Sequence, residues 1–225
     1  MSIRENYQRI RGEVPDHVTI VLAAKTRSVE EVLEAIDAGA EHIGENYVQE
    51  AEKMLTALGE RARELEWHLI GSLQKNKINK ALSIFDLFQT VDSLDSAKAI
   101  DARAARIAKV VPIYVEVNIG SEDSKSGMPP EYDAIERLVR EIARLDNVRL
   151  EGLMTMGVFS PDPEESRPYF RQARKIYDRL ALLDIPNVSL KTLSMGMSDS
   201  YQVAIEEGAS MIRLGTIVFG KRQYR

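Results

Sequence analysis

The chain has 225 residues, a formal net charge of −5 and 44% hydrophobic residues, which is typical of a globular protein and not of a disordered one. It contains no cysteine, which excludes disulfides, thiol catalysis and zinc–thiolate sites. The three histidines, His17, His42 and His68, fit no metal-ligand spacing, so we predict no metal site. The acidic balance offers no overall basic field for nucleic acid. No apolar run is long enough to span a membrane and the start is charged, so we expect a cytoplasmic protein.

Short apolar runs alternate with amphipathic segments along the whole chain, which predicts a parallel sheet with helices between its strands. We expect strands at 18–24, 42–44, 67–70, 87–91, 113–118, 150–154, 190–193 and 211–214. We expect helices at 2–11, 29–38, 47–58, 75–82, 96–109, 131–145, 164–182 and 200–206.

Eight such units predict an α/β fold, a single (β/α)₈ TIM-type barrel that fills residues 1–225 as one domain. Only residues 216–225 follow the eighth strand, which is short for a full closing helix. We expect the extra N-terminal helix at 2–11 to cover that gap. An open doubly wound sheet is the alternative, but the chain carries no Rossmann glycine fingerprint.

In such a barrel the chemistry belongs at the C-terminal ends of the strands. Lys25 ends the first apolar strand, where an unpaired ammonium is costly to bury and a neutral amine can form a Schiff base. An equally good interpretation is a lysine that reaches solvent at the mouth of the barrel. Asn46 follows the second strand and either caps the next helix or points its amide into the mouth.

The loops after the seventh and eighth strands read Ser194-Met-Gly-Met-Ser198 and Arg213-Leu-Gly215-Thr216. Small residues, hydroxyls and backbone N–H groups at these two loops favour a phosphate site, with tight turns and capping serines as the alternative. A Schiff-base lysine and a phosphate site together indicate a ligand with a carbonyl at one end and a phosphate at the other. Pyridoxal 5′-phosphate (PLP) fits this description, and so does the substrate of a sugar-phosphate aldolase.

Six blocks occur in order along nearly the whole chain: Ala24-Lys-Thr26, Gly44-Glu-Asn-Tyr-Val-Gln-Glu50, Trp67-His-Leu-Ile-Gly71 with Leu73-Gln74 and Asn76-Lys77, Ser124-Lys-Ser-Gly127, Leu193-Ser-Met-Gly-Met-Ser198, and Ile212-Arg-Leu-Gly-Thr216 with Phe219-Gly220. Each block is weak alone, but six in sequence resemble the pyridoxal phosphate homeostasis protein family, also called the proline synthase co-transcribed family. Many members of that family have Ser where Ala24 stands and His where Ser72 stands.

The resemblance implies a PLP-binding barrel similar to the N-terminal domain of alanine racemase, with the cofactor held as a Schiff base on Lys25. It places Asn46 beside the cofactor and implies that the phosphate end is held by Ser194, Ser198, Arg213, Gly215 and Thr216. Lys125, in the loop after the fifth strand, matches a family lysine proposed to help pass PLP on. Family members are regarded as carriers or regulators of PLP supply without established catalysis, with PLP-dependent apo-enzymes as possible recipients, and we expect a monomer.

Two enzyme functions remain as alternatives: a PLP-dependent amino-acid racemase and a class I aldolase that uses Lys25. A racemase of the related type needs a second base, supplied by a tyrosine of an added β-domain for which 225 residues leave no room. Tyr47 and Tyr201 are candidates for that base by elimination only.

Overall fold

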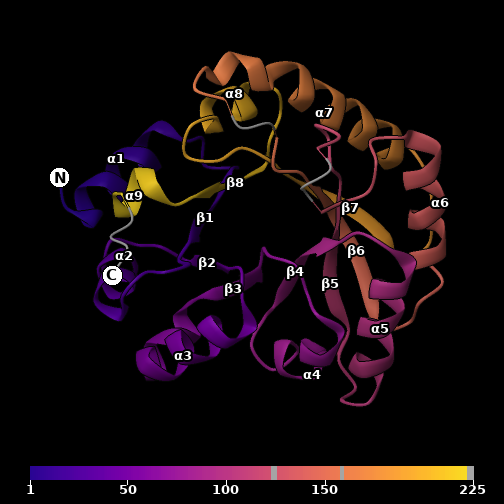
Figure 1. Ribbon diagram of the computed structural model, residues 1–225, viewed down its shortest axis with the longest axis horizontal. Coiled ribbons are helices and arrows are strands. Elements are labelled where there is room, and N and C mark those ends of the chain that lie inside the picture. Colours follow the sequence, from indigo (N-terminus) through magenta and orange to yellow (C-terminus); the bar gives the residue numbers. More distant parts are fainter. Residues whose placement is uncertain (123–125, 158–159, 222–225) are drawn as a thin grey trace.

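The computed structural model describes residues 1–122, 126–157 and 160–221, and within them eight parallel strands close into a barrel (Figure 1). The strands are β1 Thr19–Ala23, β2 His42–Glu45, β3 Glu66–Leu69, β4 Leu87–Val91, β5 Val111–Glu116, β6 Val148–Met154, β7 Val188–Ser194 and β8 Met211–Leu214. They pair in chain order, and β8 pairs back onto β1. The predicted (β/α)₈ barrel is therefore confirmed.

The α-helices form an outer ring around the strands (Figure 1). They are α1 Ile3–Glu13, α2 Val29–Asp37, α3 Val48–Leu58, α4 Ile78–Ala81, α5 Leu94–Ala105, α6 Tyr132–Ile142, α7 Arg167–Ala181, α8 Tyr201–Glu206 and α9 Thr216–Phe219. The helix expected at 75–82 is shorter than predicted: a 3-10 turn, Lys75–Lys77, precedes the single turn of α4. In the described parts of the chain, no helix has both the length and the apolar character needed to cross a membrane.

Two hydrophobic clusters follow from the alternation of side chains along each strand. One cluster lies between the strands and the helices and includes Ile113 and Val115 of β5. The other contains Tyr114, which lies between Ile113 and Val115 on β5. Its further members come from other strands and are Val21, Leu87, Met154 and Met211. Because successive side chains of a strand point to opposite faces, this second cluster fills the barrel interior.

The N-terminal helix α1 closes the barrel on the side where the chain ends in the one-turn α9. The Asn6 side-chain amide donates to the Val218 carbonyl at 2.9 Å, and the Tyr7 hydroxyl donates to the Gly39 carbonyl at 3.1 Å. A capping box between Ser2 and Glu5 begins the helix, and Ile10 is completely buried. The expected role of the N-terminal segment is confirmed: it covers the gap left by a short last helix.

We expect Ile10→Ala to lower the free energy of unfolding by about 2–5 kcal/mol, because it leaves a cavity between α1 and the barrel. Chemical denaturation followed by circular dichroism measures this loss. Ile107→Ala, at a position that is 56% exposed, is the matched control and should change the free energy little. An Ile10→Ala loss as small as the control's would mean that α1 is not part of the cooperative fold.

Candidate functional site

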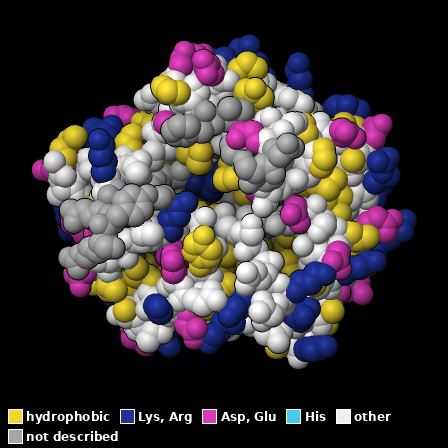
Figure 2. Space-filling view, in the orientation of Figure 1, with side chains coloured by type: hydrophobic (Ala, Val, Ile, Leu, Met, Phe, Trp, Pro, Cys, Tyr) yellow, Lys and Arg dark blue, Asp and Glu magenta, His cyan; other side chains and the backbone are white. Residues whose placement is uncertain are grey.

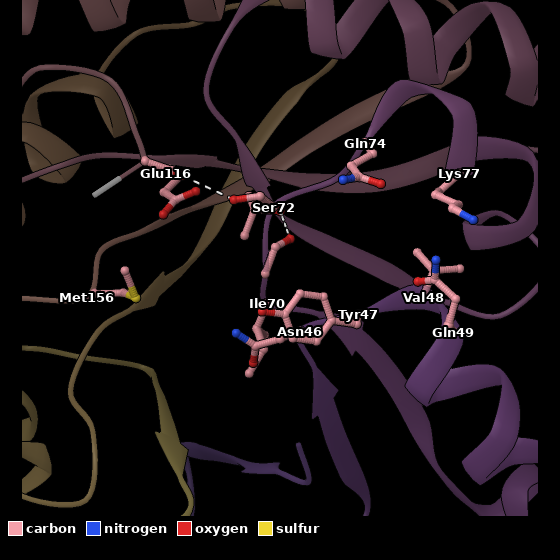
Figure 3. Close-up of a pocket in the computed structure, with 13 residues that line it drawn as sticks. Asn46, Tyr47, Val48, Gln49, Ile70, Ser72, Gln74, Lys77, Glu116 and Met156 are labelled. Atoms are coloured by element: carbon pink, nitrogen blue, oxygen red, sulfur yellow. Dashed lines mark hydrogen bonds between the residues drawn. The ribbon is translucent and has the colours of Figure 1, made fainter. Parts of the chain in front are cut away.

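The C-terminal ends of the strands surround a hollow at the centre of one face of the molecule (Figure 2). A cavity of about 430 Å³ lies there, lined by Asn46 after β2, Glu116 at the end of β5 and Met156 after β6. These side chains come from separate strands and converge on the same space (Figure 3). Tyr47 lines the cavity and is 60% exposed, so the cavity is open to solvent. We call this region the mouth.

Lys25 lies two residues beyond the end of β1, on the side of the mouth where β1 pairs with β8. Val21 of β1 belongs to the interior cluster, so Ala23 lies on the same inward-facing row of the strand. A Cβ built on Gly215 would lie 3.7 Å from the Ala23 Cβ, which places the loop after β8 directly against the end of β1. Lys25 is half-buried and does not line the 430 Å³ cavity itself. Its charge acts on Glu45 at the end of β2.

Asn46 does not cap the following helix. The N-cap of α3 is Tyr47, and no side chain completes that cap. The Asn46 side chain lies at the cavity instead, and within the described chain its buried Oδ1 has no hydrogen-bond partner. Gly71 permits this arrangement, because a Cβ there would lie 2.4 Å from the Asn46 carbonyl oxygen. Of the two sequence interpretations, the structure supports the amide that faces the mouth.

The loops after β7 and β8 lie side by side, joined by Ser198. Its Oγ accepts hydrogen bonds from the backbone N–H of Gly215 at 3.0 Å and of Ile217 at 3.4 Å. Gly196 makes the first loop possible: its φ is +93°, and a Cβ there would lie 2.5 Å from the Ala204 Cβ. Thr216 is exposed at the end of the second loop. The tight-turn interpretation is therefore correct for Gly196, while Ser198, Gly215 and Thr216 form one polar group next to the end of β1.

Ser194 and Arg213 lie deeper, inside the barrel, and do not join that loop group. Arg213 is 5% exposed, and its guanidinium donates to the Ser194 Oγ at 2.7 Å and to the Thr155 carbonyl at 2.9 Å. Ser194 donates in turn to the Gln89 Oε1 at 2.7 Å, and the Gln89 Nε2 lies 2.9 Å from the His68 Nδ1. We call Arg213, Ser194, Gln89 and His68 the polar chain. It runs through the barrel interior, where buried polar groups must find partners.

The hydrogen bonds of the polar chain start from Arg213, because a guanidinium only donates. Ser194 accepts from Arg213 and donates its single proton to the Gln89 carbonyl oxygen. The Gln89 amide nitrogen then donates to the His68 Nδ1, which leaves the proton of a neutral His68 on Nε2. Burial, together with the charge of His42, lowers the pKa of His68 to about 3, so His68 is neutral at physiological pH. The polar chain therefore selects one tautomer of a completely buried histidine.

Two buried acids at the mouth did not emerge from the sequence. Burial raises the pKa of Glu45 to about 8, helped by the charge of Glu50 and opposed by Lys25. Burial and the charge of Asp92 raise the pKa of Glu116 to about 7. Glu116 is a charged residue at the end of an apolar strand, and Lys25 likewise follows an apolar strand. The criterion that singled out Lys25, a charged side chain where a buried strand ends, therefore also applied to Glu116.

Three further residues were singled out from the sequence: Lys125, Tyr201 and Tyr47. Lys125 lies outside the described residues. Tyr201 is 5% exposed, donates to Glu13 at 3.0 Å and does not line the 430 Å³ cavity, which removes it as a second base. Tyr47 does line that cavity.

Comparisons with known proteins show similarity in sequence and fold over nearly the whole chain. Residues 1–223 match the family described as the N-terminal domain of alanine racemase. The pyridoxal phosphate homeostasis protein of Aquifex aeolicus is 41% identical over 202 residues, which cover 90% of this chain and 86% of that protein. The structure of PipY from Synechococcus elongatus with PLP bound has a TM-score of 0.88 and 32% identity, covering 97% of this chain and 100% of PipY.

Alanine racemase of Clostridium difficile shares the fold. Its TM-score is 0.83 at 16% identity, and the match covers 99% of this chain and 57% of the racemase. Sequence identity this low extends the likeness to the fold alone.

Glu45 allows a test of the electrostatics at the mouth. Its raised pKa means that the folded state keeps a proton that the unfolded state loses above about pH 4.5, so this group lowers stability as pH rises toward 8. We expect Glu45→Gln to become more stable relative to the unaltered protein between pH 5 and pH 9, as measured by chemical denaturation. The exposed Glu41→Gln is the control. A Glu45→Gln variant that loses as much stability over this range as the unaltered protein would contradict the assignment.

Proposed function

The chain belongs to the pyridoxal phosphate homeostasis protein family, and on this basis we propose that it binds PLP and serves the intracellular supply of that cofactor. When bound, PLP supplies an aldehyde that condenses with a primary amine to form a Schiff base. We assign that amine to Lys25. The observation that carries the proposal is the position of Lys25 two residues beyond β1, because the end of that strand at Ala23 packs against Gly215, which Ser198 hydrogen-bonds.

The mouth offers a polar contact to a ligand. The buried Asn46 Oδ1, at the 430 Å³ cavity, lacks a hydrogen-bond partner within the described chain. An unpartnered buried polar atom costs about 1–3 kcal/mol, so a ligand that hydrogen-bonds this atom gains that free energy on binding. Asn46 would orient the ligand from the β2 side, while the backbone carbonyl of Thr155 is already used by Arg213.

We divide the predicted phosphate residues into two groups. Ser198, Gly215 and Thr216 would hold the phosphate, because their hydroxyl and backbone groups lie together in the adjoining loops after β7 and β8. Ser194 and Arg213 would form the base of the mouth instead. Both bonded guanidinium nitrogens of Arg213 are directed to partners inside the barrel, and burial lowers its pKa to about 10 while Glu116 opposes that shift. A buried cation there adds positive potential below the ligand.

We propose a carrier and not a catalyst. Relatives such as the Aquifex aeolicus protein are named for PLP homeostasis. The cavity opens to solvent at Tyr47, and an exposed cofactor can leave for a PLP-dependent apo-enzyme without a conformational step. Of the two tyrosines considered as a second base, Tyr201 is committed to Glu13. A cytoplasmic location and a monomeric state stay predictions.

An absorbance spectrum of the protein loaded with PLP, taken before and after borohydride reduction, tests the attachment point. We expect a Schiff-base band that reduction removes, and a pyridoxyl mass on the peptide that contains Lys25. Lys25→Ala should abolish both, because it removes the amine that we assign to the Schiff base, whereas the exposed Lys98→Ala should leave both unchanged. A label on a different lysine would overturn the assignment of Lys25, and a protein that gains no band with added PLP would overturn the function.

Transfer to a PLP-dependent apo-enzyme tests the carrier role. We expect the loaded protein to reactivate such an apo-enzyme faster than an equal amount of PLP bound to serum albumin, because the mouth is open. Recovery of enzyme activity with time gives both rates. A rate no faster than that from albumin would argue for storage and against hand-over.

A further inference from the structure

The opposite end of the barrel, where the strands begin, brings together three side chains with metal-binding atoms. His42 is the first residue of β2, Glu66 the first of β3, and His68 the third of β3. The parallel register pairs His42 with Glu66, and alternation along β3 puts Glu66 and His68 on the same face. His42 and His68 are 26 residues apart in the sequence, which is why their spacing indicated no metal site.

One ligand atom of each side chain lies within 4.8 Å of those of the other two. His42 Nδ1 and His68 Nε2 are 3.2 Å apart, while the Glu66 carboxylate places Oε1 3.4 Å from His68 Nε2 and Oε2 3.5 Å from His42 Nδ1. In a tetrahedral zinc site with ligand bonds of 2.0–2.1 Å, neighbouring ligand atoms are about 3.3–3.4 Å apart. The two imidazole nitrogens, and the contact that each makes with one Glu66 oxygen, are therefore spaced much as neighbouring ligands in a zinc tetrahedron are.

We propose that His42, Glu66 and His68 bind a divalent transition-metal ion, with zinc as the best fit. Two imidazoles and one carboxylate are ligands that Zn²⁺ accepts, and they leave its fourth position open. Within the described parts of the chain, this is the one group of three His, Asp or Glu residues whose ligand atoms all lie within 4.8 Å of one another. The proposal does not depend on the proposed function, because the site lies at the end of the barrel away from the mouth.

One side of the site is buried and the other is exposed to solvent. The His68 side chain is completely buried, that of His42 is 23% exposed and that of Glu66 is 46% exposed. An ion held by these three side chains would contact the barrel interior through His68 and reach solvent beside Glu66. Asp86 and Glu151 lie near enough to act electrostatically on Glu66 and would add negative potential around the ion. The open position would be taken by water, as in exchangeable zinc sites.

Gln89 supplies the outer contact that a metal-bound histidine needs. A His68 that binds metal through Nε2 carries its proton on Nδ1, and this proton requires an acceptor. Gln89 already faces the His68 Nδ1 at 2.9 Å, and a turn of its amide group would present Oε1 there in place of Nε2. The turned Nε2 would then donate to Ser194, whose hydroxyl oxygen has two lone pairs and can accept from Gln89 and Arg213 together, while its own proton turns away from Gln89. Metal binding at one end would thus reverse the middle of the polar chain that reaches the base of the mouth.

Calorimetric titration of Zn²⁺ into the full chain, first treated with a chelator, tests the proposal. We expect one equivalent of saturable binding that weakens at least tenfold in His42→Gln and in Glu66→Gln. Both positions are partly exposed, so both variants should fold, and thermal unfolding checks this. His17→Gln and Glu64→Gln replace the same residue types at exposed positions and should bind Zn²⁺ as the unaltered protein does.

The titration is run with PLP bound and after its removal, because binding that belongs to the cofactor disappears with it. Substitution with Co²⁺ should give the strong visible bands of tetrahedral coordination, which both ligand variants lose. No saturable binding in the cofactor-free protein would overturn the proposal. Binding that neither His42→Gln nor Glu66→Gln weakens would overturn it too, since the ion would then be adventitious.

Discussion

The guanidinium of Arg213 is enclosed in the barrel, so its hydrogen-bond acceptors have to lie inside the barrel too. Its acceptors are the Ser194 hydroxyl and the Thr155 carbonyl. Because Arg213 is only 5% exposed, these protein groups take the place of bulk water as hydrogen-bond partners. Arg213 only donates, so Ser194 accepts from it and donates to the Gln89 carbonyl oxygen, and the Gln89 amide nitrogen then faces the His68 Nδ1. The orientation of the Gln89 amide thereby links Arg213 on β8 to the tautomer of His68 on β3.

The two ends of the barrel carry different functional groups, and the packed interior lies between them. Apolar side chains such as Tyr114 and Met154 fill the middle, and the polar chain passes among them. The mouth carries a lysine, an unpartnered amide and a group of small and hydroxyl residues, which suit a ligand with a carbonyl and a phosphate. The opposite end carries imidazoles and a carboxylate, which suit a cation. One connected set of hydrogen bonds links the two.

The regular parts of the fold could be read from the sequence because local periodicity reports burial directly. Strands β4 and β8 have the predicted bounds, since an apolar run buried on both faces begins and ends abruptly. The segment 75–82 was harder, because a 3-10 turn and a single helical turn replace one amphipathic helix there. Asn46 shows the same limit at a single side chain: its type suits a cap, but Tyr47 occupies the cap position.

The sequence by itself determined the barrel, the lysine at the end of β1 and the two loops after β7 and β8, because each depends on residues that are neighbours in the chain. The tertiary structure alone decided that Ser194 and Arg213 face inward, away from Ser198 and Gly215, because which face a strand residue occupies depends on the register with its neighbours. The tertiary structure also decided that His42 lies against His68. Barrel closure and strand pairing create such contacts between distant segments, and no spacing along the chain encodes them.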